Sequence, residues 1–386
     1  KMKDSGIEWI GEIPEGWETI NPKALFAQRK DRASKGERQL TSSQQYGILY
    51  QDEYMELTGS KVVTVEKDFD ILKHVETGDF VISMRSFQGG LEYSTKSGAI
   101  SSAYVMLVPN LELVYPRFYR WLLKSSVYID ALQRTTNMVR DGQAMRYSNF
   151  AQVRLFTLPL DEQKSRADFL DLECSSIDKI LFKTRSSIEE YKKLKQAVIT
   201  QAVTEGTPAM FSSPHSVKLK YLISIVSGEA IRNEQLSDFG EYPVYGGGEI
   251  IGFCSQYNTS EGSLIIGRVG ARCGCVTHTT CKSWATDNAL IVLPTCNAKY
   301  MYYVIGHCQL NNLNTSNAQP LITSTKIKNV VVPYFSDAMQ QQEIADYLDA
   351  KCAKIDGLIA KKEQLVKELE SYKKSLIYEV VTGKRE

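Results

Sequence analysis

The chain has 386 residues, 43% of them apolar and 24% charged, so it is long enough for two or three domains with cores of their own. No run of about 18 consecutive apolar residues occurs, which argues against a membrane-spanning helix. No signal peptide is visible either, so we predict a cytoplasmic protein whose eight cysteines are reduced and mostly buried. A net charge of +1 by itself argues against binding to nucleic acid.

The first part of the chain predicts short strands mixed with helices. Apolar and β-branched runs, an aromatic helix-like stretch and a polar loop follow one another before a proline. In order, we predict a strand, a second strand, a helix, a polar loop and a final strand at 78–85, 103–109, 118–123, 135–148 and 153–159. Because strands and helices alternate irregularly, an α+β domain is expected here.

A long helix is predicted next. Residues 163–205 contain neither Gly nor Pro, and a helix of about 40 residues would extend for about 60 Å. A short linker at 204–214 then separates this helix from the second half of the chain.

The second half repeats the first. Residues 341–384 align without a gap to residues 163–206, at an offset of 178, and 14 of the 44 positions are identical. The elements before this second helix follow the same order, at 262–268, 289–294, 300–305, 311–325 and 327–333. A repeated unit of this kind predicts internal two-fold pseudosymmetry and a bipartite binding partner.

Both helices carry apolar residues at alternating three- and four-residue steps, which is typical of coiled coils. In the second copy the stripe has Lys362 as its one break, and it consists of Ile355, Leu358, Leu365, Leu369, Tyr372 and Leu376. In the first copy it consists of Ile177, Ile180, Thr184, Ser187, Tyr191, Leu194 and Val198. Since the first stripe is interrupted by polar residues, we expect the two helices to pack on each other in an intramolecular coiled coil.

Positive charge is concentrated at matching places in the two halves. Residues 78–157 carry a net charge of +4 and residues 262–331 a net charge of +5, whereas the other segments are slightly acidic. Arg reads guanine with two hydrogen bonds, Asn and Gln read adenine, and Lys holds phosphate. The candidate DNA contacts in the first half are Arg85, Gln88, Arg140, Gln143, Arg146 and Tyr147. Those in the second half are Tyr245, Arg268, Arg272, Asn317, Gln319 and Lys326, with Asn314 in the same loop.

Arg268 is the strongest single candidate, because it follows a strand directly and lies between Gly267 and Gly270. A structural alternative is an ion pair with Asp287, the only acidic residue of 262–331.

Three other patterns have ordinary explanations. The Gly-rich stretch 245–252 lacks the lysine of a phosphate-binding loop, so we expect a tight turn between strands. The spacing of Cys273, Cys275, His278 and Cys281 does not match structural zinc sites. Packing is therefore preferred over zinc, with the first two cysteines on one face of a strand. No catalytic constellation, and no cofactor or metal site, is recognised.

Several motifs together resemble the specificity subunits of Type I restriction-modification systems. The motifs are 4–17 (DSGIEWIGEIPEGW), 243–248 (PVYGGG), 265–270 (IIGRVG), 286–289 (TDNA), 158–163 (LPLDEQ) and 375–384 (SLIYEVVTGK). The stretch 336–341 (SDAMQQ) departs from the family's usual helix entry, which affects only the predicted helix boundary.

This resemblance implies two target-recognition domains separated by a pair of antiparallel helices, each domain reading half of a split, asymmetric site in double-stranded DNA. The corresponding domains are 1–157 and 207–331, and the helices are 158–206 and 332–386. The resemblance further implies docking of two methyltransferase subunits that carry S-adenosylmethionine, and of restriction subunits that use ATP and magnesium. The chain itself would be neither an enzyme nor a membrane protein. The alternative is a coiled-coil adaptor that binds proteins, which the basic segments argue against.

Overall fold

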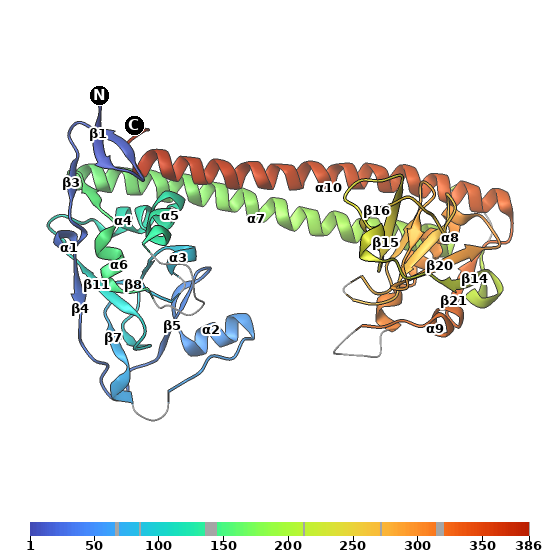
Figure 1. Ribbon diagram of the computed structural model, residues 1–386, viewed down its shortest axis with the longest axis horizontal. Helices are drawn as coiled ribbons and strands as arrows, with labels where there is room; N and C mark the ends of the chain where they lie inside the picture. Colours follow the sequence, from blue (N-terminus) through green and yellow to red (C-terminus); the bar gives the residue numbers. More distant parts are fainter. Residues whose placement is uncertain are drawn as a thin grey trace. The chain divides into compact units, whose positions relative to one another are not determined.

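The computed structural model describes residues 1–65, 69–84, 86–135, 145–210, 213–270, 272–313 and 320–385. The chain forms two compact units (Figure 1). Unit 1 comprises Lys1–Lys183 with Leu365–Glu386, and unit 2 comprises Thr184–Gln364. Within the described ranges, no helix has both the length and the apolar character needed to cross a bilayer.

Unit 1 is built around a four-stranded antiparallel sheet in the order β4-β11-β8-β9. These strands are Phe26–Arg29, Val105–Pro109, Phe80–Ile82 and Glu92–Tyr93. Four two-stranded pairs accompany it: β1 with β2, β5 with β6, β7 with β10 and β3 with β12 (Met2–Ile7, Gly11–Pro14, Leu40–Ser43, Gly47–Tyr50, Lys73–Val75, Gly98–Ile100, Glu18–Ile20 and Leu155–Thr157). Six short α-helices lie in the described part of the unit: α1 Pro22–Leu25, α2 Gln51–Thr58, α3 Ser86–Gly89, α4 Pro116–Leu122, α5 Ser126–Arg134 and α6 Tyr147–Gln152.

Unit 2 contains a second four-stranded antiparallel sheet, in the order β14-β20-β17-β18. These strands are Ile223–Ser227, Ala289–Pro294, Leu264–Gly267 and Val276–His278. The pair β13–β21 and the three-stranded sheet β16-β15-β19 accompany it (His215–Lys218, Val331–Tyr334, Glu249–Cys254, Tyr242–Gly246 and Trp284–Ala285). The helices of this unit are α8 Ala298–His307 and α9 Ser324–Lys328.

The two units share one topology. Each four-stranded sheet has its strands in the same chain-order pattern, and in each unit a strand pair leads directly into a long helix. This confirms the predicted repetition of elements, although little sequence identity extends outside the helices. The final strand of unit 2 begins later than the predicted range of 327–333. Thr323 caps the short helix α9, so the strand begins only at Val331.

The two long helices are α7 (Leu160–Glu205) and α10 (Ala338–Val381), drawn side by side in Figure 1. In unit 1 the first part of α7 shares a core with the last part of α10, and Lys373 Nζ lies 2.6 Å from Asp178 Oδ1. In unit 2 the last part of α7 shares a core with the first part of α10, and Lys195 Nζ lies 2.7 Å from Asp356 Oδ2. The helices therefore pack antiparallel, as expected.

The buried stripe on each helix agrees with the predicted one only in part, since Ile177, Thr184, Ile355 and Leu376 are buried as predicted. On α7 the least exposed positions advance in three- and four-residue steps through Leu170, Cys174, Ile177, Leu181, Thr184 and Ile188. Of the predicted stripe, five residues are instead exposed: Ile180, Leu194, Leu358, Leu365 and Tyr372. On α10, Lys362 is no break but a half-buried member of the stripe, and its Nζ lies 5.7 Å from the centre of the Tyr191 ring.

Matched glutamines attach each unit's globular part to its long helix. Gln163 is buried, and its Nε2 donates to the carbonyl oxygens of Leu113 and Leu158, both at 2.8 Å. Its Oε1 accepts from the backbone N–H of Tyr115, the residue before α4, at 2.7 Å. Gln341, its partner in the repeat, accepts from the N–H of Asn297, the residue before α8, at 3.2 Å. The identical glutamines of the two long helices thus make equivalent contacts, Gln163 with the start of α4 and Gln341 with the start of α8.

Candidate nucleic-acid interface

The Gly-rich stretch of unit 2 forms the tip of the β15–β16 hairpin. Gly246 pairs with Glu249, and the two residues between them, Gly247 and Gly248, have φ angles of 66° and 108°. Positive φ at both central residues is the requirement of a type I′ turn, which glycine meets without strain. The predicted tight turn between strands is confirmed.

This turn packs against the end of the central strand β17. A Cβ added to Gly267 would lie 2.2 Å from the carbonyl oxygen of Gly247 and 2.4 Å from that of Arg272. Only glycine allows three backbone segments to approach so closely. The end of β17, the hairpin turn and the backbone at Arg272 are therefore held in close contact.

Two candidate stretches of unit 2 meet at this loop. Val269 forms an antiparallel bridge with Leu321, and the N–H of Ile322 donates to the carbonyl oxygen of Arg268 at 3.0 Å. The loop after β17 thus lies beside the chain that leads into α9. Sequence separation of about fifty residues hid this proximity, which arises only from the fold.

The arginines of the loop are available at the surface. Arg268 is half-buried, Arg272 is exposed, and Asp287 is exposed as well. Between the residues that the structure describes, no ion pair joins Arg268 to Asp287, so the structural alternative for Arg268 receives no support. Arg272 instead pairs with Glu249, a residue that the sequence did not single out, with Nε 3.3 Å from Oε2.

Two candidates of unit 2 have structural surroundings. Tyr245 is 8% exposed and packs in a small core with Ile265 and Ile291, which leaves little of its ring for a ligand. Lys326 Nζ donates to the carbonyl oxygen of Leu313 at 3.2 Å, and so ties α9 to the residue before 314–319. Three further candidates lie outside the described residues: Asn314, Asn317 and Gln319.

Unit 1 presents fewer described candidates. Gln88 is exposed on α3, just after β8, the strand that corresponds to β17. Arg146 is exposed at the N-cap of α6, whereas Tyr147 is half-buried and donates its hydroxyl to the carbonyl oxygen of Phe26 at 3.2 Å. The structure does not bring Gln88 and Arg146 into contact through any recorded bond. Three candidates of this unit fall outside the described ranges: Arg85, Arg140 and Gln143.

Cys273 and Cys275 do not lie on one face of a strand, so the expectation that they would share a strand face was wrong. Cys273 lies in a turn before β18 and is buried, and its Sγ donates to the carbonyl oxygen of Arg268 at 3.2 Å. Cys275 and Cys281 are exposed. In the part of the chain that the structure covers, no group of three or more His, Cys, Asp or Glu side chains is arranged to hold a metal.

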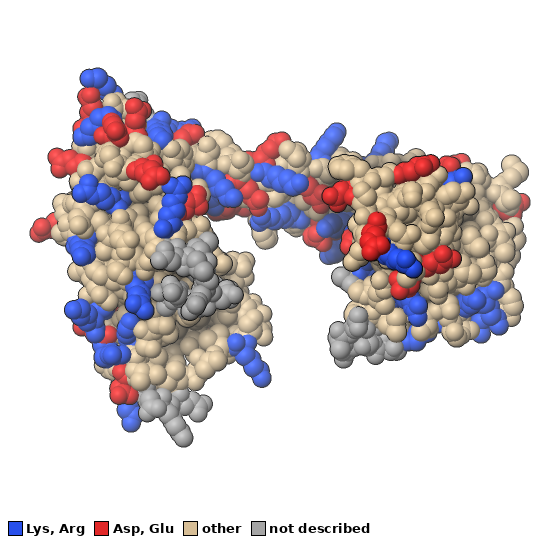
Figure 2. All heavy atoms as spheres, viewed as in Figure 1, with Lys and Arg blue, Asp and Glu red and all other residues tan. Residues whose placement is uncertain are grey.

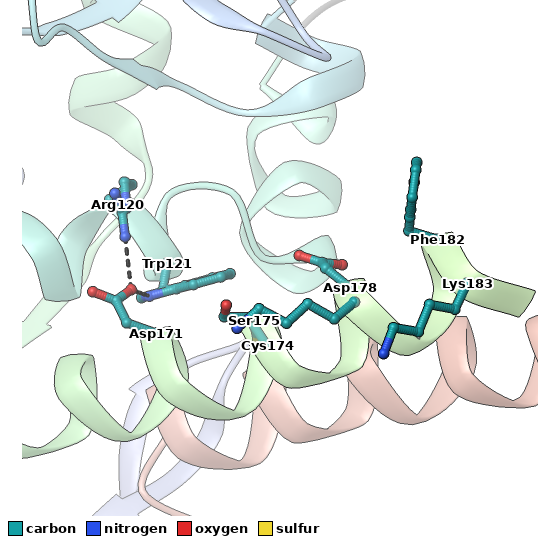
Figure 3. Close-up of a pocket in the computed structure, with 9 residues that line it drawn as sticks. Arg120, Trp121, Asp171, Cys174, Ser175, Asp178, Phe182 and Lys183 are labelled. Atoms are coloured by element: carbon teal, nitrogen blue, oxygen red, sulfur yellow. Dashed lines mark hydrogen bonds and ion pairs between the residues drawn. The ribbon is translucent and has the colours of Figure 1, made fainter. Parts of the chain in front are cut away.

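A groove of about 600 Å³ lies between α4 and α7 in unit 1 (Figure 3). At one end Asp171 accepts from the guanidinium of Arg120 and from Nε1 of Trp121, both at 2.7 Å. At the other end Phe182 points away from the helix. Burial alone would raise the pKa of Asp171, but its hydrogen bonds to Arg117 and Trp121 outweigh this and lower the pKa, so the carboxylate stays charged.

Figure 2 shows charges of both signs intermixed along the two long helices.

Comparison with known proteins identifies the family. Residues 215–368 match the family model described as the Type I restriction modification DNA specificity domain. The chain is also 29% identical over 110 residues to the Type I restriction enzyme EcoprrI specificity subunit of Escherichia coli. Residues 215–368 of this chain are therefore assigned to the Type I restriction modification DNA specificity domain family. That alignment covers 28% of this chain and 27% of the length of the curated relative.

Solved structures share the fold of this chain over nearly its whole length. One, from a study of complex assembly and conformational transition of the Type I restriction-modification system, has a TM-score of 0.73 at 14% identity and covers 96% of this chain and 99% of its own. The HsdS subunit from Thermoanaerobacter tengcongensis has a TM-score of 0.52 at 14% identity, with 96% and 98% covered. The repeated architecture is therefore a property of known specificity-subunit structures.

Proposed function

We propose that this protein is the non-catalytic DNA-recognition subunit of a Type I restriction-modification complex, and that it reads a bipartite, asymmetric site in double-stranded DNA. The repeated topology carries this proposal. Two units with the same strand order each present polar side chains just after the equivalent strand, β8 or β17. Since the two units differ in sequence outside the helices, they would read two different half-sites.

The proposed domains keep the boundaries expected from sequence. Target recognition belongs to 1–157 and 207–331, and the helical segments are 158–206 and 332–386. The start of α7 at Leu160 lies close to the limit at 157/158, whereas β21 (Val331–Tyr334), paired with β13, crosses the limit at 331/332, and α10 starts at Ala338.

The candidates with exposed or half-buried side chains and no recorded structural role are the preferred DNA contacts. Gln88 and Arg146 serve unit 1, and Arg268 and Arg272 serve unit 2; the undescribed candidates remain part of the proposal. Phosphates would be held by the positive segments, and base edges by Arg and Gln. Tyr147, Tyr245 and Lys326 act chiefly by holding the surrounding backbone in place.

Two methyltransferase subunits are the proposed protein partners, and they would bring S-adenosylmethionine for adenine methylation. Restriction subunits that use ATP and magnesium would join the same complex in the cytoplasm. Exposed apolar side chains on α7 support a docked partner: Leu172 is 67% exposed and Phe182, beside the groove of Figure 3, is 75% exposed. Large apolar residues so exposed are typical of interaction sites.

An exchange of one domain tests the recognition proposal. A chimera in which 207–331 is replaced by the same segment of a relative is combined with its methyltransferase subunits, and methylated adenines are mapped along the DNA. One half-site should change and the other should stay. Methylation that ignores the exchange, or a folded complex that does not bind DNA in a sequence-dependent way, would refute it.

A second variant tests docking. Phe182→Asp should weaken complex formation with the methyltransferase subunit about tenfold or more and leave the melting temperature unchanged, because the side chain is exposed. The matched control is Leu111→Asp, because Leu111 is 66% exposed in the globular part of unit 1. Equal effects of the two variants would contradict a specific role for α7.

A further inference from the structure

An exposed ion pair lies at the tip of the β15–β16 hairpin of unit 2. Arg272 lies in the loop after the inner strand β17, and Glu249 is the residue that follows the type I′ turn. Nε of Arg272 lies 3.3 Å from Oε2 of Glu249. Both side chains remain well exposed, at 57% and 59%. An exposed pair of this kind contributes at most about 1 kcal/mol to stability, so folding does not account for it.

The backbones that carry the pair are held firmly. The turn lies against the loop, because a Cβ added at Gly248 would be in van der Waals contact with the Cβ of Arg272, at 3.8 Å. On its other side, a Cβ at Gly274 would lie 2.4 Å from the amide nitrogen of Asn311, and the N–H of Gly270 donates to the carbonyl oxygen of Pro320 at 3.3 Å. Because the supporting backbone is already ordered, little entropy is lost when the side chains meet a ligand.

The chemistry of the pair suits a base rather than the DNA backbone. A carboxylate repels phosphate, so Glu249 is unfavourable at a phosphate-binding position. Glu249 binds Nε, and among the described residues no hydrogen bond or ion pair is recorded to the two terminal nitrogens of Arg272. Those nitrogens can donate to O6 and N7 of guanine, the two acceptors that guanine presents in the major groove.

We propose that Arg272 recognises the guanine of one G·C base pair in the half-site read by unit 2, and that Glu249 is the positioning residue that orients its guanidinium. This inference rests on the proposed function. It adds a pair of residues that determines specificity. The negative charge of Glu249 would be unfavourable if the pair contacted only phosphates.

Binding measurements on the complex of this chain with its methyltransferase subunits provide the test. Methylation mapping first gives the recognised sequence. Affinity is then measured for duplexes in which each base pair of the unit 2 half-site is changed in turn. Arg272→Lys keeps the positive charge but loses the pair of guanidinium nitrogens that can donate to one guanine. The preference for the correct base pair at one G·C position should therefore fall about 5- to 150-fold, with other positions unaffected.

Variants at Glu249 separate positioning from charge. Glu249→Ala should reduce discrimination at the same position, whereas Glu249→Gln, which can still accept from Nε, should retain more of it. Arg232→Ala removes the same charge from another exposed site of unit 2 and should leave discrimination at every position unchanged. Melting temperatures of all variants verify that they fold.

The alternative outcomes are distinct. If Arg272→Lys or Arg272→Ala weakens binding equally for all sequences and reduces the salt dependence, Arg272 contacts phosphate and the inference is wrong. It is equally wrong if neither variant changes discrimination, or if the affected position is an A·T pair. If the unaltered complex shows no sequence preference at all, the proposed function fails instead.

Discussion

Two buried tyrosines of unit 1 differ in one hydrogen bond. Tyr119 and Tyr128 are both fully buried, and the Tyr119 hydroxyl donates to the carbonyl oxygen of Phe156 at 2.9 Å. Across the described residues, the Tyr128 hydroxyl finds no partner. Burial raises the pKa of both phenols, so both hydroxyls stay protonated.

Removing each hydroxyl should therefore have opposite effects. Tyr119→Phe leaves a buried carbonyl without its donor and should lower the free energy of unfolding by about 1 kcal/mol or more. Tyr128→Phe removes an unsatisfied group and should leave the free energy unchanged or raise it by up to about 1 kcal/mol. Denaturant titration of the two variants measures the difference, and equal losses would show that Tyr128 is satisfied by water.

A histidine between two carboxylates makes unit 1 sensitive to pH. His74 on β7 has Nδ1 2.9 Å from Oε2 of Glu37 and Nε2 3.2 Å from Oε2 of Glu76. Burial alone would lower the pKa of His74, but these hydrogen bonds outweigh it and raise the pKa above its usual 6.5. The Ser97 and His74 hydrogen bonds lower the pKa of Glu76 to about 2, so both partners are ionised near neutrality.

The raised pKa fixes the sign of the effect. Since the folded state holds the proton more tightly than the unfolded state, the stabilisation is complete below about pH 6.5 and is lost as pH rises through the folded-state pKa. The difference in unfolding free energy between the protein and His74→Asn should shrink between pH 6 and pH 9, where the carboxylates stay charged. A difference that grows over this range would contradict a stabilising protonated ring.

At the scale of elements, one glutamine per unit joins three backbone segments. Gln163→Ala removes three hydrogen bonds to buried or half-buried backbone groups, two of them just before α4 and one at Leu158 just before α7. It should lower the free energy of unfolding by about 2–3 kcal/mol. Gln341→Ala should act in the same direction through α8. Gln201→Ala, an exposed position on α7, is the control and should change stability by less than about 0.5 kcal/mol.

Thermal or denaturant unfolding of the three variants gives the comparison. If Gln163→Ala behaves like Gln201→Ala, the glutamine does not position α4, and its place in the repeat has another cause.

Matched aspartates repeat the arrangement about two helical turns further on. Asp171 accepts from Arg117, Arg120 and Trp121 around α4, whereas Asp349 accepts from Lys299 and from the hydroxyl of Tyr303 on α8. The carboxylate is retained in both copies while its donors differ. Conserving the acceptor on the helix allows each globular part to diverge in sequence without losing its attachment.

For the whole molecule, helix length should set the spacing of the half-sites. One heptad added to both α7 and α10 at the unit boundary lengthens each helix by about 10.5 Å and rotates the continuing chain by only about 20°. That length corresponds to about three base pairs of B-form DNA, at about 3.4 Å for each. The recognised bases should stay the same and the gap between half-sites should grow by about three base pairs.

Methylation mapping with the lengthened chain and its methyltransferase subunits measures this gap. An insertion in α7 alone is the control and should impair binding, because it puts the two stripes out of register. An unchanged gap in the doubly lengthened protein would show that the helices do not set the spacing.

Sequence alone determined the duplication, both long helices, the order of elements in each half and the glycine turn. Each of these follows from local information: an ungapped repeat, a stretch without Gly or Pro, the alternation of apolar residues, and consecutive glycines. The family resemblance came from motifs in order along the chain, and the comparisons confirmed it.

The tertiary structure decided which apolar residues are buried and which distant segments meet. Leu358 and Ile359, Leu365 and Val366, and Ile180 and Leu181 are adjacent apolar pairs, so two overlapping stripes fit the same sequence. Only the partner helix selects one stripe, because burial depends on what lies opposite. For the same reason no local pattern revealed that Glu249 reaches Arg272, that Tyr245 lies in a core, or that the loop after β17 meets Leu321. Contacts between segments far apart in sequence arise from packing the whole chain, and packing is the property that a one-dimensional pattern does not contain.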